Sequence, residues 1–191
     1  MASVLFICTG NICRSPIAEG VFRDLMARAE VQTDVASAGI VGWEGSSAVD
    51  EAVRAAEERG SDISGHRARR LEASHVEAAD LLVCMASEHR DAVARLVPGA
   101  ASRTFTLKEL ARLLEELPSP EPGDTLTDRV RAADTLRRTG FEGQPLDEDV
   151  SDPIGMSMDM FRAVAWDVDE WCARLVAGLV GTRVAAADRE S

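Results

Sequence analysis

The chain has 191 residues, of which 33 are acidic and 21 basic, so its formal net charge is −12. Hydrophobic residues make up 46% and charged residues 28%, a composition typical of a globular chain with a packed core. The acidity argues against a nucleic-acid-binding protein, and no apolar run approaches the roughly 20 residues of a membrane span. No basic segment precedes residues 4–7 as it would in a signal peptide. We therefore expect a cytoplasmic protein with no nucleic-acid or membrane partner, and we expect a monomer or weak dimer.

The four cysteines are expected to remain reduced, because a cytosolic chain with no export signal rarely forms disulfides. They are Cys8, Cys13, Cys84 and Cys172. A zinc site at Cys8 and Cys13 would need a second pair of ligands, and the three histidines are scattered along the chain. These histidines are His66, His75 and His89. We therefore expect no metal and no cofactor.

The first half of the chain alternates between strand and helix patterns. Residues 3–8 form a short continuous apolar run, typical of a strand that is buried on both faces. Ser15 and Pro16 then open a helical pattern, with Ser15 as the expected N-cap. The elements that follow are a strand over residues 31–37, ending at Ala38 and Gly39, and a helix over residues 48–59.

The second half continues this alternation. Its predicted elements are a short helix at 73–79, strands at 80–85 and 102–105, helices at 87–96 and 106–117, and a long amphipathic helix at 158–180. Strands that alternate with helices indicate a parallel sheet with helices on both faces. We therefore predict a doubly wound α/β fold around a four-stranded parallel sheet, in a single domain over residues 1–181.

Residues 118–149 interrupt the alternation. This segment begins with three prolines and a glycine, and it holds eight acidic but only four basic residues. A helix with Thr127 as its cap is expected within it, extending to about Arg138. We interpret the segment as an acidic insertion that lies solvated on the surface, and we expect residues 182–191 to be a frayed tail.

Residues 8–15, which we call the Cys8 loop, carry the chemistry. They connect the first strand to the first helix, where loop amides and the helix N-terminus can bind an anion. Arg14 offers a planar guanidinium for phosphate, and Gly10 and Asn11 tolerate the left-handed backbone that a tight loop needs. Cys8 lies at the mouth of this positive site, where a thiolate is favoured. The loop therefore predicts a cysteine nucleophile beneath a tetrahedral oxyanion.

The Cys8 loop and the residues after it, 16–19, resemble the phosphate loop of the low-molecular-weight protein tyrosine phosphatases. Further matches to this family lie at 37–39, 60–69 and 80–85, and Asp152 with Pro153 resembles the pair that carries its general acid. The resemblance implies a phosphatase domain that hydrolyses phosphotyrosine in a phosphorylated protein substrate through a cysteinyl-phosphate intermediate.

The resemblance also implies a role for each residue of the site. Cys8 would be the nucleophile, Arg14 would stabilise the transition state, and Asp152 would be the general acid. The substrate-binding residues would be Thr9, Gly10, Asn11, Ile12, Cys13, Ser15 and Trp43. Ser15 would also donate a hydrogen bond to Cys8. Asn11 would be strained, with Ser15 and His66 as candidate partners, and His66 would support the loop. In this family a second loop cysteine, here Cys13, can trap an oxidised nucleophile reversibly.

One departure from the family pattern leaves the substrate open, and two alternative functions remain. The family often has aromatic residues after the Asp-Pro pair, whereas this chain has Ile154 and Gly155 and contains no tyrosine at all. A protein phosphoarginine phosphatase of the same fold is the first alternative, although that branch typically has threonine where this loop has Ile12. A thiol-dependent arsenate reductase is the second alternative. It would need two further cysteines placed to resolve the intermediate, and neither Cys84, inside a buried strand run, nor Cys172, on the last helix, is expected to be so placed.

Overall fold

The computed structural model describes residues 1–140 and 148–181, and these residues fold around a four-stranded parallel sheet. The strands are β1 (Ala2–Cys8), β2 (Thr33–Gly39), β3 (Leu81–Cys84) and β4 (Thr104–Thr106). Their order across the sheet is β2-β1-β3-β4, which places β1 in the interior with β2 and β3 on either side. This arrangement confirms the doubly wound parallel sheet predicted from the alternation of elements.

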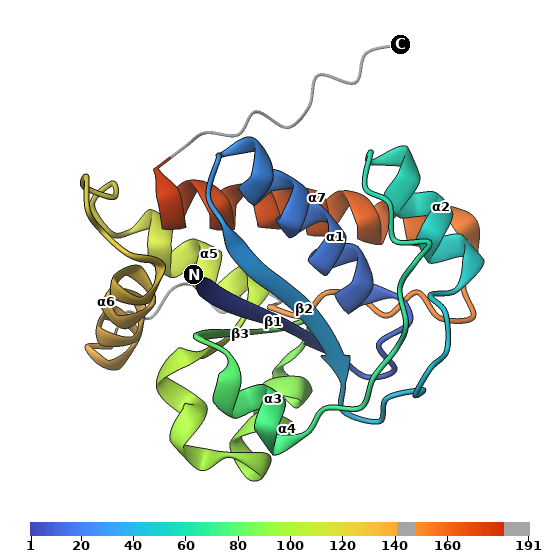
Figure 1. The fold of residues 1–191 in the computed structure, drawn as a ribbon, viewed down its shortest axis with the longest axis horizontal. Helices are drawn as coiled ribbons and strands as arrows, with labels where there is room; N and C mark the ends of the chain where they lie inside the picture. The colour runs from blue at the N-terminus through green and yellow to red at the C-terminus, as the bar shows by residue number, and fades with distance from the viewer. Residues whose placement is uncertain (141–147, 182–191) are drawn as a thin grey trace.

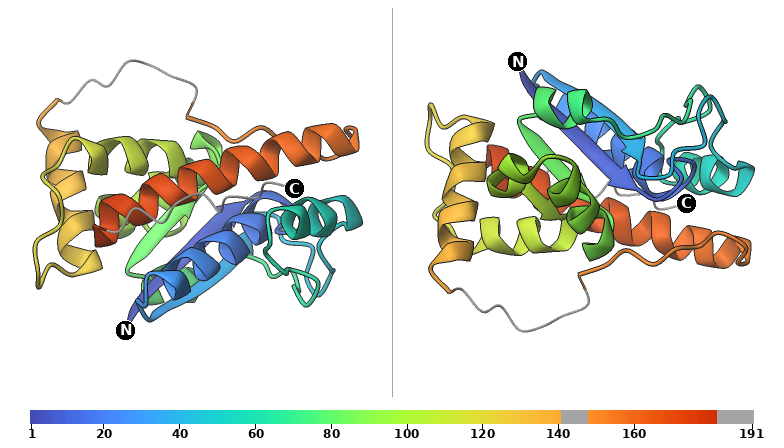
Figure 2. Two further views of the ribbon diagram at one scale, coloured as in Figure 1. Left: turned by 90° about the horizontal axis from the view of Figure 1, so that it is seen from above. Right: turned by 90° about the horizontal axis from the view of Figure 1, so that it is seen from below.

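Helices cover both faces of the sheet (Figure 1). They are α1 (Arg14–Arg28), α2 (Asp50–Glu58), α3 (Ala73–Ala78), α4 (Ser87–Leu96), a 3-10 helix η1 (Pro98–Arg103), α5 (Leu107–Glu115), α6 (Leu126–Arg138) and α7 (Met158–Val180). The long helix α7 packs between α1 and α5 on one face (Figure 2), while α3 and α4 lie on the other. Within the described ranges, no helix has the length and apolarity needed to cross a membrane.

The two faces of β1 supply two separate apolar cores, because successive side chains of a strand point in opposite directions. Phe6 packs edge-on against Phe22 of α1, with ring centroids 5.3 Å apart, and belongs to the core beneath α1, α5 and α7. Leu5 and Ile7 belong to the core on the side of α3 and α4. Burial on both faces explains why this strand appears in the sequence as an unbroken apolar run.

Several element boundaries differ from the sequence prediction for local reasons. Helix α1 begins at Arg14 with Cys13 at the N-cap, so Ser15 is not the cap that its neighbour Pro16 suggested. The cap of α6 is Thr125, not Thr127, because the Thr125 hydroxyl accepts from the backbone N–H of Asp128 and the Asp128 side chain accepts in return. The second strand begins two residues later than predicted, and the fourth is shifted to 104–106 because 98–103 forms η1.

Helix α6 packs against the rest of the domain. The expectation that the whole 118–149 segment is solvated is therefore wrong for the buried face of this helix. Val130 and Ala133 are 3% and 0% exposed, and they belong to the core that α5 and α7 share. Arg137 lies 4.1 Å from the centre of the Phe105 ring and donates to the carbonyl of Thr104. The acidic residues of the segment therefore lie around a helix that has a buried apolar stripe. Residues 141–147 of this segment, and the predicted frayed tail at 182–191, lie outside the described residues.

Replacing Ala133 by aspartate tests whether α6 contributes to folding. The new carboxylate would lie in the apolar core without a partner, so we expect Ala133→Asp to lower the free energy of unfolding by about 3 kcal/mol or more. Thr135→Asp, on the exposed side of the same helix, is the matched control and should change stability by less than about 0.5 kcal/mol. Urea unfolding followed by circular dichroism measures both, and equal effects of the two substitutions would contradict this packing.

Candidate active site

Cys8 is the last residue of β1, and its buried thiol lies at the carboxyl edge of the sheet. The backbone N–H of Asn11 donates to the Cys8 sulfur at 3.3 Å, and the Ser15 hydroxyl oxygen lies 2.9 Å from the same atom. The Ser15 oxygen also accepts from the Asn11 side chain at 2.9 Å, which leaves the hydroxyl proton available to the sulfur. Two hydrogen-bond donors, one from the loop backbone and one from α1, therefore converge on the Cys8 sulfur.

Asn11 adopts the left-handed conformation, with φ of 58°, and its side chain is fully buried. Its side-chain amide nitrogen donates to Ser15 and to Ser37 at 2.9 and 2.8 Å. Its side-chain oxygen accepts from the backbone N–H of Arg69, and its backbone carbonyl lies 2.7 Å from Nε2 of His66. The side chain therefore uses both donors and its acceptor, which offsets the cost of the strained backbone.

A second layer of contacts extends from Asn11 to α1 and β2. Ser37 donates to Glu19 at 2.6 Å, and Nδ1 of His66 lies 3.9 Å from the same carboxylate oxygen. Gly39 allows the end of β2 to approach the loop, because a Cβ there would lie only 2.7 Å from the carbonyl oxygen of Thr9. Sequence reasoning named His66 and missed Ser37 and Glu19, whose roles become visible only when β2 and α1 are placed beside the loop.

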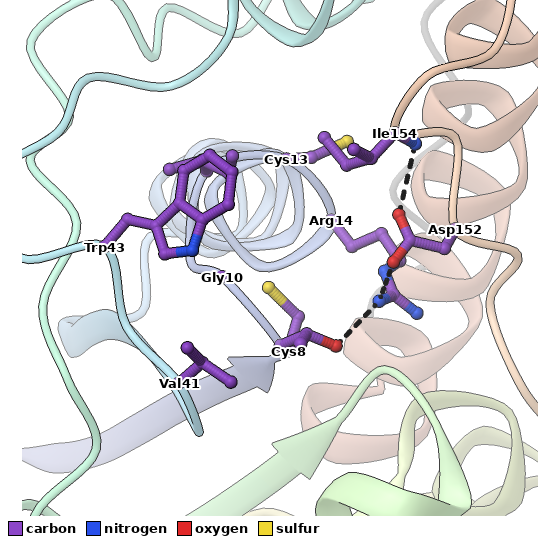
Figure 3. Close-up of a pocket in the computed structure, with 10 residues that line it drawn as sticks. Cys8, Gly10, Cys13, Arg14, Val41, Trp43, Asp152 and Ile154 are labelled. Atoms are coloured by element: carbon purple, nitrogen blue, oxygen red, sulfur yellow. Dashed lines mark hydrogen bonds and ion pairs between the residues drawn. The ribbon is translucent and has the colours of Figure 1, made fainter.

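Arg14 and Asp152 meet on one side of Cys8 (Figure 3). One terminal nitrogen of Arg14 donates to Asp152 at 2.6 Å and to the Thr9 hydroxyl at 3.2 Å, and the other donates to the carbonyl of Val150 at 3.1 Å. The Arg14 side chain is 6% exposed, whereas that of Asp152 is 46% exposed. The guanidinium is therefore part of the floor of the site, and the carboxylate is at its entrance, where the backbone N–H of Ile154 also reaches it.

The segment that carries Asp152 is held in place because it caps the N-terminus of helix α4. The N-cap residue of α4 is Ala86, which has no side-chain acceptor, and the exposed N–H of Ser87 donates instead to Asp149 at 2.7 Å. The backbone N–H of Val150 donates to the carbonyl of Met85, just beyond β3, at 2.7 Å. Residues 149–152 are thus attached to the edge of the sheet, a contact that the acidic composition around Asp149 did not indicate.

The pocket above Cys8 has a volume of about 180 Å³ and mostly apolar walls. Its lining residues are Cys8, Thr9, Gly10, Ile12, Cys13, Arg14, Val41, Trp43, Asp152 and Ile154. Trp43 and Ile154 face each other across the opening in Figure 3, and they are 54% and 44% exposed. Five of the expected substrate-binding residues line this pocket: Thr9, Gly10, Ile12, Cys13 and Trp43. Asn11 and Ser15, which were expected to bind substrate as well, are fully buried and absent from the lining, and they belong with His66 to the network that supports the loop.

The other cysteines do not share the position of Cys8. Cys84 and Cys172 are both 0% exposed within the cores. Cys13 lines the pocket, and burial together with the nearby Cys8 and Asp152 raises the pKa of its thiol. Within residues 1–140 and 148–181, no cluster of three or more histidine, cysteine or carboxylate side chains is arranged to hold a metal ion.

His89 is a further buried residue of the site that sequence reasoning did not assign. It lies in the first turn of α4, is 0% exposed, and places Nε2 at 3.0 Å from the Thr9 hydroxyl. Burial, followed by the nearby charge of Arg14, lowers its pKa to about 4, although Asp149 and Asp152 act in the opposite direction. The sequence does place His89 in the first turn of the helix that follows β3. Only the strand order, with β3 beside β1, shows that this helix borders the Cys8 loop.

The lowered pKa of His89 predicts a loss of stability in acid. The unfolded chain binds a proton at this residue below about pH 6.5, whereas the folded chain does so only below about pH 4. The free energy of unfolding should therefore fall by about 3 kcal/mol on account of His89 as the pH is lowered from 6.5 to 4. Urea unfolding at a series of pH values should show a shallower decline for His89→Gln, and equal slopes would contradict the prediction.

Comparisons with known proteins show which family this chain is similar to. The sequence model of the family described as low molecular weight phosphotyrosine protein phosphatase matches residues 3–133. A protein-arginine-phosphatase of Geobacillus stearothermophilus is 28% identical over 172 residues, covering 90% of this chain and 92% of that protein. The low molecular weight protein-tyrosine-phosphatase Ptp of Acinetobacter johnsonii is 37% identical over 105 residues, covering 55% of this chain and 71% of that protein.

A solved structure leads to the same family. The crystal structure of a low molecular weight protein tyrosine phosphatase from T. tengcongensis matches with a TM-score of 0.73 and 30% identity, covering 94% of this chain and 100% of that chain. The chain described here belongs to the low molecular weight phosphotyrosine protein phosphatase family.

Proposed function

We propose that the protein hydrolyses phosphotyrosine in phosphorylated proteins through a cysteinyl-phosphate intermediate. The observation that carries this proposal is the convergence on one small pocket of the Cys8 sulfur, the Arg14 guanidinium and the Asp152 carboxylate. A nucleophile, an anion-binding fork and an acid are the groups that phosphoryl transfer from an ester to water requires. Asp152 lies beyond the residues matched by the family model, so its role rests on its position and on the pair it forms with Pro153.

In the first step, the Cys8 thiolate attacks phosphorus in line with the leaving oxygen. The phosphorus–sulfur bond forms as the phosphorus–oxygen bond breaks, and Asp152 gives its proton to the departing phenolic oxygen. Arg14 and the backbone N–H groups of the Cys8 loop bind the three equatorial oxygens of the phosphoryl group. Because these donors are fixed by the fold, they need little reorganisation as charge develops in the transition state.

In the second step, water attacks the phosphorus of the cysteinyl phosphate. The Asp152 carboxylate takes a proton from this water, the phosphorus–sulfur bond breaks, and inorganic phosphate forms. The thiolate is restored as the leaving group, with donation from Asn11 N–H and from Ser15. One carboxyl group thus acts as acid and then as base, and no cofactor is required.

The walls of the pocket favour an aromatic leaving group. Ile12, Val41 and Trp43 present apolar surface next to the phosphate-binding groups, and a cavity of roughly 150 Å³ suffices for a benzene ring. Stacking of a phenyl ring on Trp43 would contribute about 0.5–1.5 kcal/mol. The guanidinium of phosphoarginine is polar and needs acceptors. Asp152 is the one carboxylate that residues 1–140 and 148–181 place in this lining, and it is already paired with Arg14.

A protein phosphoarginine phosphatase is the second candidate function. One observation favours it: the proteins named protein-arginine-phosphatase align over 172 residues of this chain, whereas the Acinetobacter johnsonii tyrosine phosphatase aligns over 105. The arsenate reductase alternative receives no such support, because Cys84 and Cys172 are fully buried and neither lines the pocket.

Hydrolysis of p-nitrophenyl phosphate tests the mechanism. We expect Cys8→Ser to be inactive, because the serine hydroxyl is a far weaker nucleophile than a thiolate. We expect Asp152→Ala to lower kcat by about 10²- to 10⁴-fold, with a larger loss for phenyl phosphate, whose leaving group needs the proton more. Asp159→Ala removes a carboxylate whose side chain is 88% exposed, and it should retain full activity. Full activity in Cys8→Ser would end the proposal.

Comparison of phosphotyrosine and phosphoarginine peptides tests the substrate. We expect wild-type kcat/KM to be higher for phosphotyrosine, and we expect Trp43→Ala to lower it about 2- to 12-fold through lost stacking. Inhibition by inorganic phosphate, which has no ring, should be unchanged in Trp43→Ala. We also expect Ile12→Thr to move the ratio of the two kcat/KM values toward phosphoarginine. Faster wild-type turnover of phosphoarginine would favour the second candidate.

Peroxide treatment tests the role of the second loop cysteine. Peroxide converts the Cys8 thiolate to a sulfenic acid, and attack by the Cys13 sulfur would release water and form a disulfide that thiols reduce. We expect wild-type activity to return after addition of dithiothreitol, and the activity of Cys13→Ser to be lost irreversibly. Equal recovery in the two proteins would contradict this protective role for Cys13.

A further inference from the structure

His89 and Arg14 both contact the hydroxyl of Thr9, which lines the pocket. The Arg14 guanidinium carries only N–H donors, so it donates to the Thr9 oxygen at 3.2 Å. The His89 Nε2 lies 3.0 Å from the same oxygen and 3.4 Å from a carboxylate oxygen of Glu88. The direction of the hydrogen bond between His89 and Thr9 therefore decides where the Thr9 proton points.

The surroundings of the His89 ring assign its proton to Nε2. A carboxylate oxygen beside Nε2 accepts hydrogen bonds only, so it favours the tautomer that carries a proton on this nitrogen. The other ring nitrogen, Nδ1, is buried and has no hydrogen-bond partner among the described residues. With Nε2 protonated, His89 donates to Thr9, because the Thr9 oxygen at 3.0 Å is nearer than the Glu88 oxygen at 3.4 Å. Nδ1 then holds a lone pair and no unpaired proton.

A hydroxyl group has one proton to donate and two sites that accept. Arg14 and His89 then occupy both accepting sites of the Thr9 oxygen, so its own proton points toward neither of them. We propose that the Thr9 hydroxyl donates a hydrogen bond to an oxygen of the bound phosphoryl group, and that His89 is the positioning residue that sets this direction. This inference rests on the proposed function of the Cys8 loop as a phosphoryl-binding site.

The burial of His89 keeps this arrangement constant over the physiological range. A pKa of about 4 leaves the His89 imidazole neutral near pH 7. The Thr9 hydroxyl is therefore in contact with one cation, Arg14, and not with two. In the opposite tautomer, Thr9 would donate to Nε2, and the pocket would lose one donor. His89 therefore acts on the substrate through Thr9 and touches no reacting atom.

Isothermal titration calorimetry with inorganic phosphate tests the inference without requiring turnover. We expect Thr9→Val to weaken phosphate binding about tenfold or more, because a hydrogen bond to a charged oxygen is lost, and we expect Thr9→Ser to bind as the wild type does. His89→Leu should weaken binding similarly, and His89→Gln, which retains a side-chain N–H donor, should restore most of the affinity. In the Thr9→Val background, His89→Leu should cause no further loss.

Two results would overturn the inference. One is wild-type phosphate affinity in Thr9→Val, and the other is an equal loss from His89→Leu in the wild-type and Thr9→Val backgrounds, which would indicate a general structural effect. Should His89→Leu not fold, nitrogen-15 spectra of the wild-type imidazole still decide the tautomer, and a proton on Nδ1 would refute the assignment. Failure of the proposed function would appear separately, as wild-type phosphate binding without hydrolysis of p-nitrophenyl phosphate.

Discussion

The left-handed backbone of Asn11 is the constraint on which the site depends. A single buried carboxamide connects α1 through Ser15, β2 through Ser37, and the 66–69 segment through Arg69. The turn at Asn11 lets its own N–H reach the Cys8 sulfur, three residues earlier in the chain. If the carboxamide lost its partners, the strained φ would relax, and the loop donors would no longer converge on one point. The rigidity of the pocket is therefore a property of the buried network beneath it.

The sequence predicts the elements better than the contacts between them. The apolar runs of β1 and β3 identify buried strands, and Gly10 and Asn11 indicate a tight loop before a helix. The capping box of α6 was also readable, because Asp128 follows Thr125 by three residues, whereas the residue three after Thr127 is a valine. His89 and Asp149 could not be assigned in this way. Both act through α4, and that helix borders the Cys8 loop only because β3 pairs with β1.

A net charge of −12 does not prevent the binding of an anion, because the field inside the pocket is local. At physiological ionic strength the Debye length is about 8 Å, so most surface carboxylates are screened from the site. In the proposed mechanism, the donors of the Cys8 loop and the Arg14 guanidinium bind the phosphoryl oxygens directly, at distances where screening by salt is slight. Asp152, the one carboxylate among the described residues of the lining, is paired with Arg14 and so repels an incoming anion less than an isolated carboxylate would.

Arg14 shows why this arrangement requires a guanidinium. Arg14 is only 5% exposed, and a buried cation is tolerated only where acceptors surround it. The acceptors come from Thr9, Val150 and Asp152. They lie in different directions around the two terminal nitrogens of the rigid, planar guanidinium. A lysine ammonium would present a single nitrogen on a flexible chain and could not hold all three at once. The same plane thus fixes the Asp152 segment against the Cys8 loop, and in the proposed mechanism it also presents its positive charge to the substrate.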